Sequence, residues 1–354
     1  MKTKMNYNHS SLFPRVCVST TATCRILIAL LCFMITLLAV PANAVTNELV
    51  GNSESHSIEK FNSAGTWIGT FASTGPWKPL GIAASPLTND VFVATLTSNV
   101  ILRYKSDGTR LVCLGGAPTP CWSTFNLYSY FGVNPIESLV FDTSGNLYVA
   151  SHYGTSGYQV VILKFSPAAL LKKMPVPTGV PITTTVGRGD QMAFDQLGNI
   201  CIASFIAPNT VQCYDPTSGA LTFDYASEFS GFSPLIQPVG LAFSPSNNLY
   251  VSSVFVGQVV YEATPHKGPM LALASGLVSD VGFIATDSSG LLYVPSFHNA
   301  EGRYGGSNLC TFYSCMDYDT SSDVVYKIDP TTGTTTDFIT SNLWGPYQMI
   351  FVAF

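Results

Sequence analysis

The fold of this chain is decided by the segment Ser138-Leu-Val-Phe-Asp-Thr-Ser-Gly-Asn-Leu-Tyr-Val-Ala150. Its two apolar runs, Leu139 to Phe141 and Leu147 to Ala150, have the length of short strands. The polar residues between them include Gly145 and Asn146, which tolerate the positive φ angles of tight turns. The segment therefore predicts a β-hairpin.

The same phrase recurs along the chain and is followed each time by another short strand. Variants of the hairpin lie at residues 81–94, 191–203, 240–252 and 283–295. The following strands are expected at residues 100–104, 161–165, 211–214, 259–261 and 325–328. Turns at residues 106–108, 215–219 and 329–333 then lead to a fourth strand. Four antiparallel strands repeated at this interval are typical of propeller blades, so we expect an all-β fold with only a short helical turn at residues 167–174.

The two ends of the chain predict the number of blades. Residues 348–354 supply one more first strand after the fifth full repeat, and residues 47–50, 58–61 and 66–71 supply a second, third and fourth strand. A blade built from both ends would close the ring and remove exposed sheet edges. We therefore expect a single six-bladed β-propeller over residues 45–354, closed by the C-terminal strand.

The repeated phrase resembles NHL-repeat proteins and the related gluconolactonase and senescence-marker-protein-like six-bladed propellers. The resemblance covers residues 47–354 and implies the propeller fold. It does not select a function, because such propellers include lactonases, lyases and pure binding modules. In gluconolactonase-like members a Glu, an Asn and an Asp at the starts of first strands hold a divalent metal. Glu137 and Asp190 match two such positions, and Val239 departs from the pattern.

Strand direction predicts which residues share a face of the ring. The residues just before each first strand lie on the same face as the loops between second and third strands. The channel-mouth positions on that face are Leu80, Glu137, Asp190, Val239, Gly282 and Tyr347. The loops add His152, Tyr153, Phe205, Phe297, His298 and, in the long loop 297–323, Tyr304. We expect Tyr347, Tyr153, Phe297, His298, Tyr304 and Phe205 to contact a ligand.

Glu137 and Asp190 are the candidate catalytic or metal-binding pair. Two carboxylates at one mouth can act as a general acid and base, or can bind one divalent cation such as Ca²⁺, Mg²⁺ or Zn²⁺. His152 would act as a base if its ring turned toward Glu137. The alternative is structural, with both acids hydrogen-bonded to backbone amides or water at a solvated pore mouth.

The N-terminus and the cysteines predict export. A basic lead ending at Arg25 precedes the apolar run 26–40 and the small-residue site Ala42-Asn-Ala44, which together are typical of a signal peptide over residues 1–44. The run is shorter than the roughly 20 residues of a membrane span. Six cysteines remain after cleavage, and sequence spacing favours the disulfides 113–121, 201–213 and 310–315. We expect a secreted or periplasmic protein with no membrane span after cleavage.

The composition restricts the function further. Only 10% of the 354 residues are charged, with 16 basic and 21 acidic side chains, and 47% are hydrophobic. This excludes a disordered tail and a nucleic-acid binder, and no phosphate-binding loop or nucleophile elbow occurs. Two hypotheses remain for a monomer: a propeller that binds a small molecule, glycan or partner protein at the channel mouth, and a metal-dependent lactonase-like hydrolase or lyase.

Overall fold

The structure is a computed structural model. It describes residues 46–95, 100–111, 134–153, 159–172, 176–185, 187–206, 210–225, 238–253, 259–263, 271–275, 277, 280–297 and 323–354. These residues belong to one compact unit, Val45–Phe354. The predicted signal peptide lies outside the described residues. In the described part of the chain, no helix combines the length and the apolar character needed to cross a bilayer.

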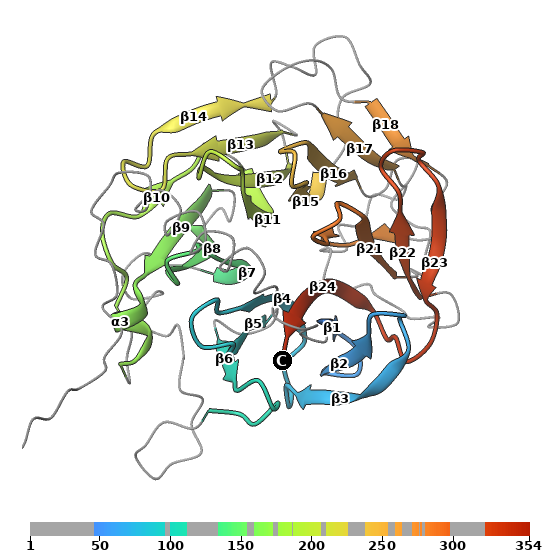
Figure 1. The fold of residues 1–354 in the computed structure, drawn as a ribbon. Helices are drawn as coiled ribbons and strands as arrows, with labels where there is room; N and C mark the ends of the chain where they lie inside the picture. The colour runs from blue at the N-terminus through green and yellow to red at the C-terminus, as the bar shows by residue number, and fades with distance from the viewer. Residues whose placement is uncertain are drawn as a thin grey trace, which may run out of the picture. The chain divides into compact units, whose positions relative to one another are not determined.

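Six antiparallel sheets form the ring, one for each predicted blade (Figure 1). Their innermost strands are β4 (Pro79–Ala84), β7 (Asn134–Phe141), β11 (Gly187–Phe194), β15 (Pro238–Phe243), the pair β19 (Asp280–Val281) and β20 (Ala285–Thr286), and β24 (Pro346–Ala353). The second strands are β5 (Val91–Thr95), β8 (Leu147–Tyr153), β12 (Ile200–Ile206), β16 (Leu249–Ser253), β21 (Leu292–Phe297) and β1 (Thr46–Asn52). The predicted six-bladed β-propeller is therefore confirmed.

The third and fourth strands follow outward in the same order. The third strands are β6 (Ile101–Tyr104), β9 (Gln159–Phe165), β13 (Val211–Tyr214), β17 (Val259–Ala263), β22 (Val324–Ile328) and β2 (Ser57–Asn62). The outermost strands are β10 (Ile182–Thr183), β14 (Leu221–Asp224), β18 (Leu271–Ala274), β23 (Thr335–Ile339) and β3 (Trp67–Ser73). The blades are numbered from β4, so that β24 and β1 to β3 form blade 6. Within the described residues, blade 1 has three strands, and a single bridge joins Tyr104 and Arg110 beyond β6.

The ring closes as the two ends of the sequence predict. β24 pairs antiparallel with β1, so that the C-terminal strand becomes the innermost strand of a blade completed by β1, β2 and β3. Figure 1 shows the red C-terminal strand beside the blue N-terminal ones. The side-chain amide of Asn47 also donates to the Phe354 carbonyl at 2.7 Å. Closure in this way leaves no blade without neighbours on both sides.

The hairpin turns between first and second strands have the predicted chemistry. One residue in each turn has a positive φ angle, namely Asn89, Gly145, Gly198, Asn247 and Gly290. Glycine and asparagine adopt this left-handed conformation at low cost, which explains their place in the repeated phrase. The short helix α3 (Pro167–Leu170) also lies where it was expected and is capped by Ser166.

The core is divided into clusters between blades, because successive side chains of a strand point to opposite faces of its sheet. Leu147 and Val149 of β8 pack toward blade 1, whereas Tyr148 between them packs against Ile202 of blade 3. One such cluster lies between each pair of neighbouring blades. This arrangement accounts for the high hydrophobic content of a chain made almost entirely of short strands.

One of the three predicted disulfides lies in the described part of the chain. Cys201 of β12 and Cys213 of β13 face each other in register and are bonded. The predicted pairs 113–121 and 310–315 lie outside the described residues.

Candidate functional site

The predicted channel-mouth positions lie within the first half of the innermost strands rather than just before them, and Gly282 lies between β19 and β20. The side chains of Leu80, Glu137, Val239 and Tyr347 are at most 2% exposed. Glu137 in particular is fully buried, and the choice between a catalytic, metal-binding or structural role for it stays open. Asp190 lies in β11, but its side chain is outside the described set, and its predicted meeting with Glu137 stays a prediction.

Close approach of the inner strands contributes to this burial. A Cβ atom placed on Gly81 would lie 3.1 Å from the Glu137 carbonyl oxygen, so β4 and β7 meet almost backbone to backbone. The N–H of Phe283 likewise donates to the Tyr347 carbonyl at 2.9 Å, which links blade 5 to blade 6 where the innermost strand of blade 5 is interrupted. Gly81, and Gly282 beside Phe283, therefore permit this close approach of neighbouring blades.

Two of the predicted ligand-contacting residues lie against each other. Phe297 at the end of β21 stacks on Tyr347 with 5.6 Å between ring centroids, and Phe283 meets Tyr347 edge to face at 4.9 Å. Phe297 is 2% exposed. These rings pack the described part of the mouth rather than line an open surface.

The remaining predicted contact residues are located only in part. His152 and Tyr153 end β8, and Phe205 lies near the end of β12, so all three stand in the second strands rather than in the loops predicted for them. Nothing is described of these three side chains. His298 and Tyr304 lie outside the described residues.

One step further along the inner strands, polar side chains join the blades across the channel. Gln191 accepts hydrogen bonds from the N–H groups of Leu241 and Ile284 at 2.9 and 2.8 Å, and it donates to the Ile284 carbonyl at 2.8 Å. Gln348 accepts from the N–H of Ile82 at 2.5 Å, and Ser138 accepts from the N–H of Met192 at 3.0 Å. We call Ser138, Gln191 and Gln348 the polar belt. It pairs backbone groups of strand edges that have no neighbouring strand.

A cavity of about 410 Å³ lies in the channel on the other side of the polar belt from the mouth. Every blade contributes consecutive residues from the later part of its inner strand, for example Ile82 to Ala84 and Leu139 to Phe141. Side chains of a strand alternate between the two faces of its sheet, so consecutive residues can line one cavity only along the edge of the strand. The cavity wall is therefore largely backbone edge with apolar side chains, and it lies toward the face of the hairpin turns.

The chemistry of this cavity is that of a neutral site. Among the residues that the structure describes, its lining includes no Asp, Glu, His, Lys, Arg or Cys. The amides of Gln191 and Gln348 stand at its inner end. Gln348 is 6% exposed, and its Nε2 group donates no hydrogen bond within the described residues. The cavity thus offers apolar contact with a few hydrogen-bonding groups, as small-molecule sites do.

No complete metal site forms among the side chains that the structure describes. At the mouth they supply the Glu137 carboxylate and the Tyr347 hydroxyl, fewer oxygens than the six to eight around Ca²⁺. Asp195, Cys201 and Cys213 lie within 4.8 Å of one another, but both sulfur atoms are in the disulfide and cannot ligate as thiolates. A metal at the mouth would therefore depend on Asp190 and on other residues outside this set.

Sequence reasoning missed the polar belt and the cavity beyond it. The belt occupies one column of the repeat, filled by Gly81, Ser138, Gln191, Gly240, Phe283 and Gln348. The available signal was the two glutamines at this position of the repeat, next to apolar strand residues. A buried side-chain amide needs hydrogen-bond partners, and near the axis these come from other blades.

Comparison with known structures agrees with this architecture. A protein of unknown function from Bacteroides caccae aligns with a TM-score of 0.58 at 15% identity, over 87% of this chain and 99% of that one. A chain of a nidogen/laminin complex aligns at 0.59 and 12%, over 87% and 98%. Virginiamycin B lyase from Staphylococcus aureus aligns at 0.51 and 9%, over 83% and 80%. No protein-family profile and no curated protein sequence matches the chain.

These neighbours share the fold, and identities this low carry no statement about activity. The chain is a six-bladed β-propeller, the architecture implied by its resemblance to NHL-repeat and gluconolactonase-like proteins.

Proposed function

We propose that this chain is an exported propeller that binds an uncharged small molecule in its central channel without catalysing a reaction on it. The observation that carries the proposal is the 410 Å³ cavity, whose described lining residues come from all six blades and include no titratable side chain. General acid–base and nucleophilic catalysis need such a side chain within hydrogen-bond reach of the substrate. Apolar contact with the cavity walls and hydrogen bonds from backbone edges would hold the ligand.

Export is part of the proposal. It is supported by the signal-peptide pattern of residues 1–44 and by the Cys201–Cys213 disulfide, because structural disulfides persist in oxidising compartments. The proposed protein acts as a monomer, in the periplasm or outside the cell.

The second candidate is a metal-dependent hydrolase or lyase that works at the mouth. Full burial of Glu137 near the mouth favours it, since carboxyl groups with environments unlike water occur often at functional sites. In this form Glu137 and Asp190 would hold a divalent cation, which would polarise a carbonyl group and activate water.

Metal content distinguishes the two candidates. The purified protein is dialysed and its divalent metals are quantified, together with hydrolysis of simple sugar lactones. The binding proposal predicts a substoichiometric metal content and no turnover. One equivalent of metal per chain that is lost in both Glu137→Ala and Asp190→Ala would contradict it and support the hydrolase.

A further inference from the structure

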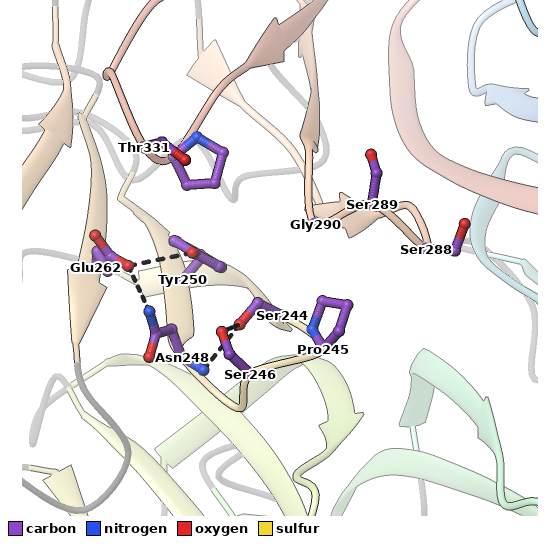
Figure 2. A pocket seen from close by; sticks show the side chains of 11 residues that line it. Ser244, Pro245, Ser246, Asn248, Tyr250, Glu262, Ser288, Ser289, Gly290 and Thr331 are labelled. Atoms are coloured by element: carbon purple, nitrogen blue, oxygen red, sulfur yellow. Dashed lines mark hydrogen bonds between the residues drawn. The ribbon is translucent and has the colours of Figure 1, made fainter.

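A second cavity lies away from the channel, between the turns of blades 4 and 5. Its volume is about 430 Å³, within the range of small-molecule sites. Hydroxyl groups of Ser246, Ser288, Ser289 and Thr331 line it, and Glu262 is the one charged side chain among its described lining residues. Figure 2 shows Glu262 beside Tyr250 and Asn248 on the blade 4 side, with Ser288 and Ser289 on the blade 5 side. We call this cavity the blade 4–5 pocket.

The repeat supplies an internal comparison for Glu262. In blade 2 the turn carboxylate is Asp142, whose Oδ1 accepts from the Asn146 N–H at 2.8 Å. Its Oδ2 accepts from the Asn146 side-chain amide at 2.7 Å and from Tyr148 at 3.4 Å. Asp287 of blade 5 likewise uses both oxygens, the second of them for Tyr293 at 3.1 Å. In these turns both carboxylate oxygens hold the hairpin.

Blade 4 divides this task between two residues. Ser244 replaces the aspartate and accepts from the Asn248 N–H at 2.9 Å. The carboxylate comes instead from Glu262 on β17, directly opposite Tyr250 in the sheet. Its Oε1 accepts from the Asn248 side chain at 2.8 Å and from the Tyr250 hydroxyl at 3.2 Å. Burial and the nearby Glu262 carboxylate raise the pKa of Tyr250 to about 12, so this phenol stays protonated and donates.

The division leaves one oxygen of Glu262 unused. Its Oε2 accepts no hydrogen bond from the residues that the structure describes. The hydroxyl groups of Ser288 and Thr331 also have no side-chain partner within that set, and Pro245 and Pro330 add apolar surface. A strong acceptor and several hydroxyls that can both donate and accept match a polyol, and the lining residues that the structure describes include no basic side chain.

We propose that the blade 4–5 pocket binds a saccharide unit, with a sugar hydroxyl donating to Oε2 of Glu262. The serine and threonine hydroxyls hydrogen-bond the other hydroxyl groups, and the proline rings contact the C–H face of the sugar. This site is separate from the channel and does not depend on the function proposed for it.

The test uses methyl glycosides of glucose, galactose, mannose and N-acetylglucosamine as probes of the purified protein, with NMR saturation transfer and calorimetry. At least one glycoside is expected to bind. Glu262→Gln should weaken binding at least about tenfold, the effect of losing one hydrogen bond to a charged acceptor. The glutamine carbonyl can still accept from Asn248 and Tyr250, so the hairpin is retained. Thr331→Val removes an exposed hydroxyl without risk to the fold and should also weaken binding.

Asp142→Asn is the matched control, because it alters the corresponding carboxylate in a blade where both oxygens hold the turn. It should leave glycoside binding unchanged. The proposal is wrong if no glycoside binds, if Glu262→Gln and Thr331→Val bind as the wild type does, or if Asp142→Asn weakens binding equally. Preferential binding of ethanolammonium, abolished by Glu262→Gln, would identify a cation site and would also overturn it.

Discussion

At the scale of single residues, Glu48 on β1 is the most unusual side chain of the described core. It is 2% exposed, lies opposite Phe61 and Phe351 in the sheet, and has one carboxyl oxygen, Oε2, without a hydrogen bond. Burial raises the pKa of Glu48 to about 8, and a backbone hydrogen bond and the charge of Lys327 offset this only in part. The group is therefore protonated in the folded chain at neutral pH.

This pKa predicts how stability depends on pH. The carboxyl titrates near 4.5 in the unfolded chain and near 8 in the folded one, so the folded state binds more protons between these values. Its contribution to the free energy of unfolding is fully present below pH 4.5 and is lost as pH rises through 8. Glu48→Gln should remove a loss on the order of 3 kcal/mol between pH 5 and 9, measured by urea unfolding.

Glu59 provides the control for this experiment. It is also buried, but its carboxylate accepts from Ser57, Trp67 and Thr70. Glu59→Gln should lower stability at every pH, because it weakens hydrogen bonds to a charged acceptor. An unchanged pH dependence in Glu48→Gln would contradict the assignment of the slope to Glu48.

At the scale of elements, the blades are joined near the axis by the polar belt as well as by apolar packing. Gln191 connects β11 to β15 and to the residue before β20, so one side chain links blades 3, 4 and 5. Gln191 is 5% exposed, so removing its amide would leave the backbone groups of its three hydrogen bonds without a partner in the protein.

Gln191→Leu should therefore lower the free energy of unfolding by about 2 to 4 kcal/mol, because buried backbone groups of neighbouring strands lose their partners. The measurement is urea unfolding of the variant and the wild type. Gln196→Leu is the matched control, since Gln196 is exposed in the turn before β12, and it should change stability by less than about 0.5 kcal/mol. Equal stability of both variants would show that the polar belt does not support the ring.

The elements themselves were predictable because their signals are local and repeated. Each of these signals depends on a few neighbouring positions: the hairpin phrase, its Gly or Asn turn residues, and the facing Cys201 and Cys213. The phrase occurs five times, so its pattern could be recognised although single copies differ from it. The interrupted inner strand of blade 5 was not predictable, because it follows from the bond between Phe283 and Tyr347 of the next blade.

At the scale of the whole molecule, the ring was predictable and its cavities were not. The repeat predicted Glu137 just before an inner strand, and the structure has it within β7; its burial depends on how closely neighbouring blades approach. The channel cavity is bounded by the edges of six strands far apart in sequence. The sequence did contain a signal for the blade 4–5 pocket: Ser244 stands where the turns of blades 2 and 5 have an aspartate, and Glu262 lies in the third strand of the same blade.

The most direct measurement is titration of the protein with N-phenyl-1-naphthylamine, an uncharged dye that fluoresces in apolar surroundings. Binding in the channel predicts a saturable signal that is lost in Ala285→Trp, where the larger side chain would fill part of the cavity. Ala64→Trp, in an exposed turn of blade 6, should bind the dye as the wild type does, and circular dichroism confirms that both variants fold. Absence of saturable binding, or equal binding by Ala285→Trp and Ala64→Trp, would contradict ligand binding in the central channel.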